Sequence, residues 1–340
     1  MKGPSVAIVI LNWNGRMFLE QYLPSVFNSS YHNLQIIVGD NHSTDDSIAY
    51  LKENFPLVKI IQNDSNYGFA EGYNKVLAQV EADYFVLLNS DVEVHYNWIK
   101  PVIDLMEGDE RIAIAQPKIK SVINRNEFEY AGAAGGFLDR LMYPFCRGRI
   151  FGTVEKDENQ YDDDCEIFWA SGCALFIKAE VWKRVGGLDA NFFAHMEEID
   201  LCWRVKNLGY KVMYCAKSTV WHLGGGTLTV ESPRKTYLNF RNNYYLIRKN
   251  LKPRKAFWII PFRFCLDFLA LIQFLVQGKF KNALAISKAH RNVVLSFFSK
   301  KTSFNKDISA KPNTTGLYKH SIVWDYFILN NKTFNKLRKR

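Results

Sequence analysis

The chain has 340 residues, of which 48% are hydrophobic and 15% aromatic, so it can form one large domain with an appendage, and global disorder is excluded. Its net charge of +10 hides an asymmetry: residues 1–230 carry 21 Lys and Arg against 30 Asp and Glu, a net of −9, whereas residues 231–340 carry 23 against 4, a net of +19. The acidic body and basic tail predict an anionic partner for the tail, either a nucleic acid or an acidic membrane surface.

The predicted elements of the first 115 residues alternate between strands and helices. We expect strands at Val6–Leu11, Leu34–Gly39, Val58–Ile61, Tyr84–Leu88 and Ile112–Ala115. Helical patterns lie between them, near Arg16–Phe27, Ser47–Asn54, Ala70–Val80 and Asn97–Glu107. This alternation predicts an α/β fold, in which helices cover a parallel sheet and ligands bind at the carboxyl ends of the strands.

The pattern loosens after residue 116 into a Gly-rich, aromatic region. A strand is expected at Cys173–Ile177, then a helix at Glu198–Leu208 and a strand at Lys211–Tyr214. Beyond residue 231 the chain turns basic, with an apolar stretch at Phe257–Val276 and a helical pattern at Asn282–Phe298.

The cysteines and the N-terminus indicate the compartment. The six cysteines contain no Cys-x-x-Cys pair, which favours a reduced, cytosolic protein. The apolar run Val6–Leu11 is too short for the core of a signal peptide, so we expect that the chain is not exported.

Polar residues follow the first two predicted strands. Asn12-Trp13-Asn14-Gly15 stands where a dehydrogenase would carry Gly-x-Gly-x-x-Gly, and that fingerprint is absent. Asp40 follows the second strand, where its carboxylate can accept hydrogen bonds from a ribose or a base. The run Asp40–Ser47 suits a turn and a helix N-cap equally well.

Two further segments place polar groups at the ends of elements. In Asn66–Asn74, Gly68 and the first helical N–H groups can lie near a phosphate, or the segment is an ordinary loop before a helix. Asn89 and Asp91 end the fourth strand and, being two residues apart in extended chain, project to the same side. Their oxygens suit Mg²⁺ or Mn²⁺ bridging a diphosphate, although Asn-Ser-Asp is also common in turns.

An acidic cluster opens the helix predicted at Glu198–Leu208. Glu197, Glu198 and Asp200 crowd its first turn beside His195, which exceeds what capping requires. One of these acids can serve as a general base if it lies within hydrogen-bond reach of a hydroxyl. His222, at the end of a strand, is either structural or a metal ligand.

In this order, these segments resemble the family 2 glycosyltransferases, which have the GT-A fold, over roughly residues 5–250. The resemblance rests on the motifs VAIVILNWNG, GDNHSTDDS, NYGFAEGYN, LLNSDVEV, WASGCALFIK, GGLDANFF, EEIDLCWR and VWH. It implies a Rossmann-like, mixed but mostly parallel sheet with flanking helices. Within the family, the chain looks most like bacterial rhamnosyltransferase-like enzymes of surface polysaccharide assembly.

The resemblance also implies a domain organisation. We expect a catalytic domain over residues 1–250, with a nucleotide-binding half (1–115) and an acceptor half (116–250), and a basic helical extension over residues 251–340.

The resemblance carries roles onto individual positions. It implies that Asp40 contacts the nucleotide base, that Glu198 is the catalytic base, and that Asn89, Asp91 and His222 hold the metal. The donor-binding residues expected are Asn12, Asn14, Asp40, Asn66, Gly68, Asn74, Asn89 and Ser90. The residues expected on the acceptor side are Trp169, which can equally fill the core, Ser171, Gly172, Glu197, Asp200 and Arg241.

Two positions depart from the family pattern. Asn89 replaces the first Asp of an Asp-x-Asp motif and leaves Asp91 as the direct anionic ligand. Glu198 replaces an Asp with a side chain that is one methylene longer.

These roles imply an inverting glycosyltransferase that moves a sugar from a nucleotide-diphosphate donor to a hydroxyl of a glycan or lipid-linked acceptor, with Mg²⁺ or Mn²⁺. One alternative is a nicotinamide-dependent oxidoreductase, which the missing glycine fingerprint disfavours. The other is a non-catalytic binding protein, supported only by the basic tail. No nucleic-acid partner is expected, because long aliphatic runs interrupt the basic stretch.

The tail contains one stretch of membrane-spanning length, Phe257–Val276, which includes Pro261, Arg263 and Asp267. Cations flank it: Arg248, Lys249, Lys252, Arg254, Lys255, Lys279 and Lys281. We expect a helix lying in the interface of an anionic membrane, with a full span or a helix buried in a homodimer as alternatives. The protein is then cytoplasmic and peripheral to the inner face of the membrane, where Arg241 and Arg248 can meet the phosphate of a lipid-linked acceptor.

Overall fold

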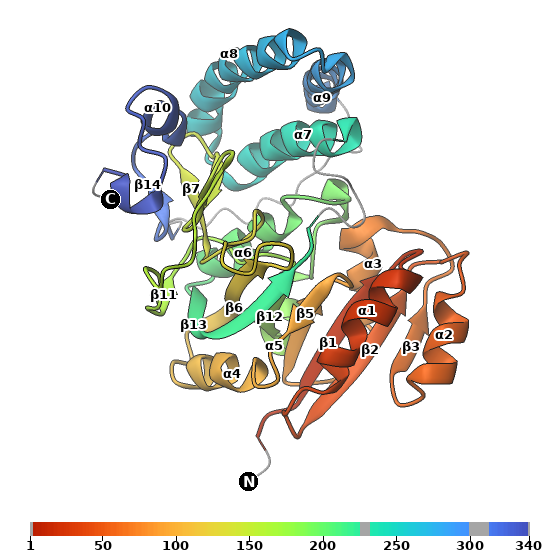
Figure 1. The fold of residues 1–340 in the computed structure, drawn as a ribbon. Coiled ribbons are helices and arrows are strands. Elements are labelled where there is room, and N and C mark those ends of the chain that lie inside the picture. Colours follow the sequence, from red (N-terminus) through yellow and green to blue (C-terminus); the bar gives the residue numbers. More distant parts are fainter. Residues whose placement is uncertain (1–2, 225–231, 299–312, 339–340) are drawn as a thin grey trace.

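The structure is a computed structural model that describes residues 3–224, 232–298 and 313–338. Its centre is a nine-stranded mixed sheet in the order β11-β13-β6-β12-β4-β1-β2-β3, with β5 paired to β13 (Figure 1). A smaller five-stranded sheet and a layer of C-terminal helices adjoin it.

The first half of the large sheet is parallel. Its strands are β1 (Val6–Asn12), β2 (Leu34–Asp40), β3 (Lys59–Gln62) and β4 (Tyr84–Leu88). The helices between them are α1 (Arg16–Phe27), α2 (Ser47–Asn54) and α3 (Gly68–Leu77). Alternate residues of β1 enter two separate cores, Ala7 and Val9 on one face and Val6, Ile8 and Ile10 on the other. Because both faces are covered, the strand reads as a continuous apolar run.

The second half makes the sheet mixed. Strand β12 (Ala174–Lys178) runs antiparallel between β4 and β6 (Ile112–Ser121). Strand β13 (Lys211–His222) is parallel to β6 and shifts register between Cys215 and Thr219, so the two short segments expected there are one irregular strand. The other elements of this half are β5 (Val92–Val94), β11 (Cys165–Glu166), α4 (Ile99–Glu107), α5 (Ala179–Val185), η1 (Ala190–Phe192) and α6 (Glu197–Asn207).

The small sheet joins the loosely patterned region to the tail. It contains β7 (Gly136–Asp139), β8 (Pro144–Cys146), β9 (Arg149–Ile150), β10 (Thr153–Val154) and, from the tail, β14 (Leu317–Tyr318). The Asp139 carboxylate accepts hydrogen bonds from the N–H groups of Leu141, Tyr143 and Ile322, which ties α10 (Ile322–Phe327) to the turn after β7. The last described element is η2 (Phe334–Lys336).

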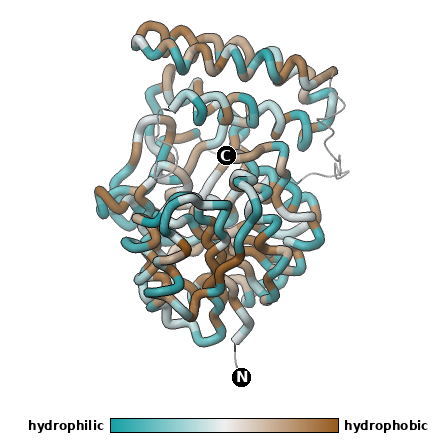
Figure 2. Tube along the Cα trace, turned by 90° about the vertical axis from the view of Figure 1, so that its right-hand side faces the viewer, coloured by the Kyte–Doolittle hydropathy of each residue, from teal (hydrophilic) through white to brown (hydrophobic). Residues whose placement is uncertain are grey.

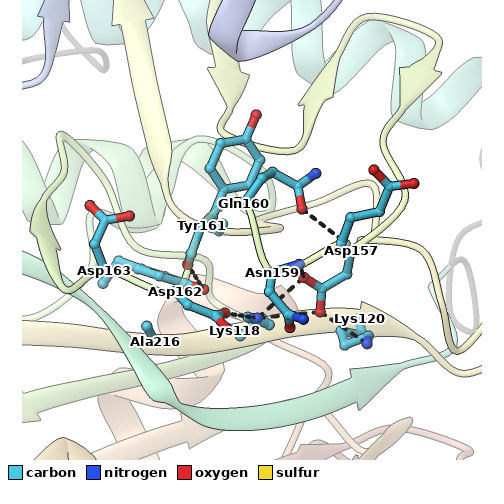
Figure 3. A network of polar contacts seen from close by, with 12 residues as sticks. Lys118, Lys120, Asp157, Asn159, Gln160, Tyr161, Asp162, Asp163 and Ala216 are labelled. Atoms are coloured by element: carbon cyan, nitrogen blue, oxygen red, sulfur yellow. Dashed lines mark hydrogen bonds and ion pairs between the residues drawn. The ribbon is translucent and has the colours of Figure 1, made fainter.

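A buried ion cluster fastens the segment 155–164 to the large sheet (Figure 3). The Lys118 ammonium, on β6, lies 3.3 Å from an Asp157 oxygen and 2.5 Å from an Asp162 oxygen, and Lys120 lies 3.0 Å from Asp157. Each buried charge therefore has a partner of opposite sign, which makes the cluster structural.

Three helices cover the end of the molecule away from the N-terminus (Figure 1). They are α7 (Pro233–Asn250), α8 (Pro253–Val276) and α9 (Phe280–Phe298). The Lys249 ammonium of α7 pairs with Asp189 at 2.6 Å and with Asp200 at 2.9 Å, and this fixes α7 to the body. Hydrophobic residues run along the outer helices of this end (Figure 2).

Candidate active site

Two of the predicted donor-side residues meet where β1 and β2 end. Asn12 and Asp40 are register partners and both are buried. The amide of Asn12 donates to Asp40 Oδ1 and to Ser43 Oγ, each at 3.2 Å, while Asp40 Oδ2 accepts from the N–H of Ser43 at 3.0 Å. Asn12 Oδ1 is buried and has no hydrogen-bond partner among the described residues, so it is available to a ligand donor.

Asn14 lies beside this pair in a left-handed conformation with φ of 50°. Its Oδ1 accepts from the N–H of Thr44 at 2.7 Å, and its own N–H donates to Ser43 Oγ at 2.9 Å. Asn14 therefore joins the loops after β1 and β2, and its side chain is largely committed to that join.

The turn at Asn66 and Gly68 is fixed by amide side chains. The amide of Asn41 donates to Asn66 Oδ1 and to the Gly68 carbonyl, at 3.0 and 2.9 Å. Gly68 has φ of 72°, and a Cβ there would lie 2.6 Å from the ring of Phe193, so only glycine fits. The Phe193 carbonyl already accepts from the N–H groups of Phe69 and Ala70, so the start of α3 is occupied by protein.

Asn74 is committed to the backbone of another loop. Its amide donates to the Leu188 carbonyl at 2.8 Å, and its Oδ1 accepts from the Leu188 N–H at 2.9 Å. Both ends of the amide are used, so Asn74 positions the Gly186–Asp189 turn and does not point at the donor side.

The three predicted metal ligands converge at the ends of β4 and β13. His222 Nε2 lies 3.1 Å from Asp91 Oδ1 and 3.3 Å from Asn89 Nδ2, and both Asp91 and His222 are buried. Ser90 lies in the intervening turn and is partly exposed. The sequence did not indicate a fourth member, Glu129, whose Oε1 lies 3.4 Å from His222 Nδ1.

Anionic groups surround the His222 imidazole and favour its charged form. Although burial lowers it, Cys173, Glu129 and Asp91 together raise the pKa of His222 well above its usual range. No group of three or more His, Cys, Asp or Glu side chains has metal-binding spacing within the described ranges, so the protein alone does not form a closed cage. An open site with one carboxylate, one imidazole and one amide fits a divalent cation that takes its remaining ligands from substrate phosphates and water.

The predicted acids lie at the start of α6. Glu197 is buried and Glu198 is half-buried. The Oε2 atom of each residue is enclosed and has no hydrogen-bond partner in the described part of the chain. Burial raises the pKa of Glu198 to about 7, and burial together with Glu198 raises that of Glu197 well above its usual range. A carboxyl with a pKa near 7 suits a general base. At neutral pH a large share of it is ionised, and the carboxylate still accepts a proton readily.

The backbone before α6 is strained. Phe193, His195 and Met196 all have φ between 66° and 75°, which is costly for residues with a side chain. Strain of this kind is stored where the surrounding structure fixes a functional group, and here it orients the first turn of α6.

Two neighbouring residues bring the metal side and the acids together. A Cβ at Gly172 would lie 3.9 Å from the Cβ of Glu198, which places Gly172 directly beside that acid. The next residue is Cys173. Burial raises the pKa of its thiol, and the charge of the His222 imidazole and its hydrogen bond to the sulfur lower that pKa. The Cys173 carbonyl also accepts from the Asn89 N–H at 3.0 Å. Glu198 and the Asp91–His222 pair therefore flank one short segment.

Two of the residues expected on the acceptor side lie in the core. The Trp169 ring packs against Gly136 and its N–H donates to the Phe137 carbonyl at 3.0 Å, so it fills the core as the alternative expectation stated. Asp200 is fully buried, and its oxygens accept from Arg204, Lys249 and Asn250 at 2.8 to 2.9 Å. It cannot reach a substrate, because its bonds hold α6 and α7 together.

Two further acceptor-side residues have structural bonds. Ser171 Oγ donates to the Ala131 carbonyl at 2.6 Å. Arg241 Nη2 donates to the Phe192 carbonyl at 2.9 Å, and its guanidinium lies near the rings of Tyr237 and Tyr245. Arg241 thus anchors η1, which precedes the strained segment.

Comparison with known proteins identifies relatives of this chain in sequence and in fold. A family model described as glycosyl transferase family 2 matches residues 5–173. The N-acetylglucosaminyl-diphospho-decaprenol L-rhamnosyltransferase of Mycobacterium tuberculosis is 21% identical over 229 residues, which cover 63% of this chain and 75% of the relative.

Solved structures show the same fold. GalNAc-T7 with UDP, GalNAc and Mn²⁺ superposes with a TM-score of 0.57 at 17% identity, over 74% of this chain and 49% of that chain. The mannosyltransferase PcManGT from Pyrobaculum calidifontis, in complex with GDP-Man and Mn²⁺, superposes with a TM-score of 0.54 at 12% identity, over 86% of this chain and 88% of that chain.

The family match sets aside both alternatives, the nicotinamide-dependent oxidoreductase and the non-catalytic binding protein. The chain belongs to the family 2 glycosyltransferases, has the GT-A fold and is a glycosyltransferase that resembles rhamnosyltransferases.

Proposed function

We propose that this protein is an inverting, metal-dependent glycosyltransferase that moves a sugar from a nucleotide-diphosphate donor to a hydroxyl of a glycan or lipid-linked acceptor in surface polysaccharide synthesis. The observation that carries the proposal is the placement of Glu198 and of the Asp91–His222 pair on the two sides of Gly172 and Cys173. The name of the mycobacterial relative, which includes a diphospho-lipid, supports a lipid-linked acceptor.

Asp40 and Asn12 would bind the nucleoside part of the donor. Both are buried at the carboxyl ends of adjacent parallel strands, where open α/β sheets bind their ligands. The Asp40 carboxylate accepts two hydrogen bonds from the described residues, so it has further lone pairs for a base or ribose donor.

Asp91, His222 and Asn89 would hold the divalent cation, with Glu129 behind His222. When bound, the cation would neutralise the charge of the diphosphate leaving group. Both solved neighbours described above contain Mn²⁺, which supports a divalent cation in general.

Glu198 would take the proton of the acceptor hydroxyl. The hydroxyl oxygen then forms a bond to the anomeric carbon, while the bond from that carbon to the diphosphate oxygen breaks on the opposite face. The electron pair leaves with the nucleoside diphosphate, and the configuration of the sugar inverts, as in inverting glycosidases with a hydroxyl in place of water.

The outer face of α8 would attach the enzyme to a membrane. Among the described residues, α8 is the one helix long and apolar enough to cross a membrane. The two charges that argue against a span, Arg263 and Asp267, are buried against the body. The opposite face exposes large apolar side chains, including Phe257, Trp258, Phe262, Phe268 and Leu269.

Exposed cations lie at the start of α8 and on the next helix, α9, which is the composition of a surface that lies in an anionic lipid interface. They are Lys252, Arg254, Lys255, Lys281, Lys288 and Arg291. A peripheral position on the cytoplasmic face of a membrane follows from this proposal, and it would bring the site within reach of a lipid-linked acceptor.

The donor half of the proposal is tested by thermal shift with UDP, dTDP and GDP, each with and without Mn²⁺. We expect one nucleotide to raise Tm only when Mn²⁺ is present, and Asp91→Asn to abolish that Mn²⁺-dependent shift. Asp104→Asn, an exposed carboxylate in an α4 surface ion pair, is the matched control and should leave the shift unchanged. A full Mn²⁺-dependent shift in Asp91→Asn would remove the metal role.

A further inference from the structure

Two cations on the metal side of the site form no ion pair with any carboxylate of the described residues. Arg149, on β9, is 9% exposed, and its only hydrogen bond among the described residues runs from Nε to the Tyr130 carbonyl, at 2.7 Å. Its guanidinium lies 4.0 Å from the centre of the Tyr130 ring. Lys235, on the first turn of α7, is half-buried and forms no ion pair with any described residue.

The other buried cations of the body are paired. Arg147, two residues from Arg149, lies 3.0 Å from an Asp163 oxygen, and Lys206 lies 2.7 Å from Glu166. Lys118 has two carboxylates and Lys249 has two more. A buried cation without a counter-ion is costly, and Arg149 differs from these cations in having no carboxylate partner among the described residues, so it is suited to receive an anionic ligand.

Lys235 interacts electrostatically with both the metal side of the site and the segment before the acidic helix. Burial lowers the pKa of its ammonium, and Glu129, Arg149 and Asp91 all act on that ammonium. Burial lowers the pKa of His195 to about 4, and Lys235 contributes to this effect. The ammonium is therefore within electrostatic range of Arg149 and Asp91 and also of His195, which precedes the acids of α6.

We propose that Arg149 and Lys235 form a subsite for a phosphate group of the acceptor. A guanidinium presents a planar fork of N–H donors and an ammonium a compact charge, and together they match a phosphate next to a site of sugar transfer. This proposal rests on the proposed function and names the acceptor class, a diphosphate-linked carrier.

The position of Arg149 favours the acceptor over the donor as the source of this phosphate. The nucleoside residues Asn12 and Asp40 lie on β1 and β2, whereas Arg149 belongs to the small sheet. The Tyr130–Ala131 segment that holds Arg149 is bonded in turn to Ser171, next to Gly172 and the base. The small sheet and α7 adjoin the helices whose outer face is proposed to meet the membrane.

Binding of farnesyl diphosphate, compared with farnesol, tests this subsite without any transfer reaction. Isothermal titration calorimetry would be run on the full chain, with the wild type, Arg149→Met, Lys235→Met and the charge control Lys100→Met, which lies in the exposed α4 ion pair. We expect each of the first two variants to bind farnesyl diphosphate about tenfold or more weakly, as for loss of a charge-assisted hydrogen bond. Farnesol binding and the control should not change.

The donor is the second arm of the same experiment. Binding of the preferred nucleoside diphosphate with Mn²⁺ should stay within about twofold of wild type in both variants. If instead the nucleotide loses affinity and farnesyl diphosphate does not, the subsite belongs to the donor and the proposal is wrong; unchanged binding of both probes also overturns it.

Folding and catalysis are controlled separately. Lys235→Met removes a half-buried side chain that forms no ion pair with the described residues and should keep the wild-type Tm, so it tests the proposal even if Arg149→Met does not fold. Glu198→Gln should bind farnesyl diphosphate as the wild type does, so failure of the subsite and failure of the proposed catalytic role give different results.

Discussion

At the scale of single residues, the proposed chemistry depends on two adjacent acids in the first turn of α6. Both are enclosed, and burial is the largest cause of the raised pKa of each. Because the two carboxyls interact, their titration belongs to the pair, and the pair is expected to release one proton near pH 7 and to hold the other to higher pH.

The rate should therefore depend on pH in one direction. The base is active as the carboxylate, so kcat/KM is expected to rise with pH through about 7 and to fall about tenfold for each unit below it. Initial rates between pH 5.5 and 8.5, at saturating Mn²⁺, measure this. A profile that stays flat down to pH 5.5 would contradict a raised Glu198.

Several site residues could be predicted from the sequence, because each follows a long apolar strand or opens a helix. Asn12, Asp40 and Asp91 are of this kind, since the ends of parallel strands meet at one edge. Glu129, Arg149 and Lys235 could not be found in this way. They come from short strands, turns and a polar helix, and only the tertiary fold brings them to the Asp91–His222 pair.

At the scale of elements, the same contrast separates the two sheets. Strands β1 and β4 of the parallel half were predicted because they are buried on both faces and read as continuous apolar runs. The small sheet was not, because its strands are two to four residues long and too short for a period to show. Helix α7 was missed because polar and apolar residues are mixed on its buried surface: Asn242 and Asn243 are fully buried beside apolar residues and donate to loop carbonyls.

The sequence pattern of helix α8 predicts the helix but does not predict which of its faces packs against the body. Arg263 and Asp267 are spaced i, i+4, so they share one face, but the sequence does not say which neighbour that face meets. In the structure Arg263 Nη1 donates to the Leu141 carbonyl at 2.9 Å, and Asp267 accepts from the hydroxyls of Tyr143 and Tyr244 at 3.2 and 2.5 Å. The charges thus anchor the helix and leave its apolar face outward.

Removal of one of these charges should loosen the helix. Asp267→Ala leaves Arg263 buried without its carboxylate and is expected to lower the free energy of unfolding by about 3 kcal/mol, as for other broken buried pairs. Urea denaturation followed by circular dichroism measures the change. Phe268→Ser, on the exposed face of the same helix, is the control and should change stability by less than about 0.5 kcal/mol; equal losses in both variants would contradict the inward anchor.

At the scale of the whole molecule, the charge asymmetry and the apolar outer face point to one surface. The basic last third contributes the helices at the end away from the N-terminus, and α8 is largely exposed there (Figures 1 and 2). The proposed division near residue 250 falls at the end of α7, although β14 returns from the tail to pair with β7.

Membrane binding should need both the charge and the apolar face. We expect the protein to float with vesicles that contain anionic lipid and not with neutral ones, and salt to weaken the binding. Trp258→Ser should reduce vesicle binding about tenfold, since the side chain is 71% exposed on the outer face of α8. Leu57→Ser, an exposed apolar side chain in the N-terminal half, is the control. Equal binding by the Trp258 variant and the wild type would contradict this orientation.

The central claim, that Glu198 is the base opposite a metal-bound donor, is tested most directly by one variant measured in two ways. Glu198→Gln keeps the shape of the side chain and removes its ability to accept a proton. Donor affinity with Mn²⁺, measured by calorimetry, is predicted to stay within about twofold of wild type, while transfer falls by about 100-fold or more. Near-normal transfer by Glu198→Gln, with intact donor binding, would contradict the account.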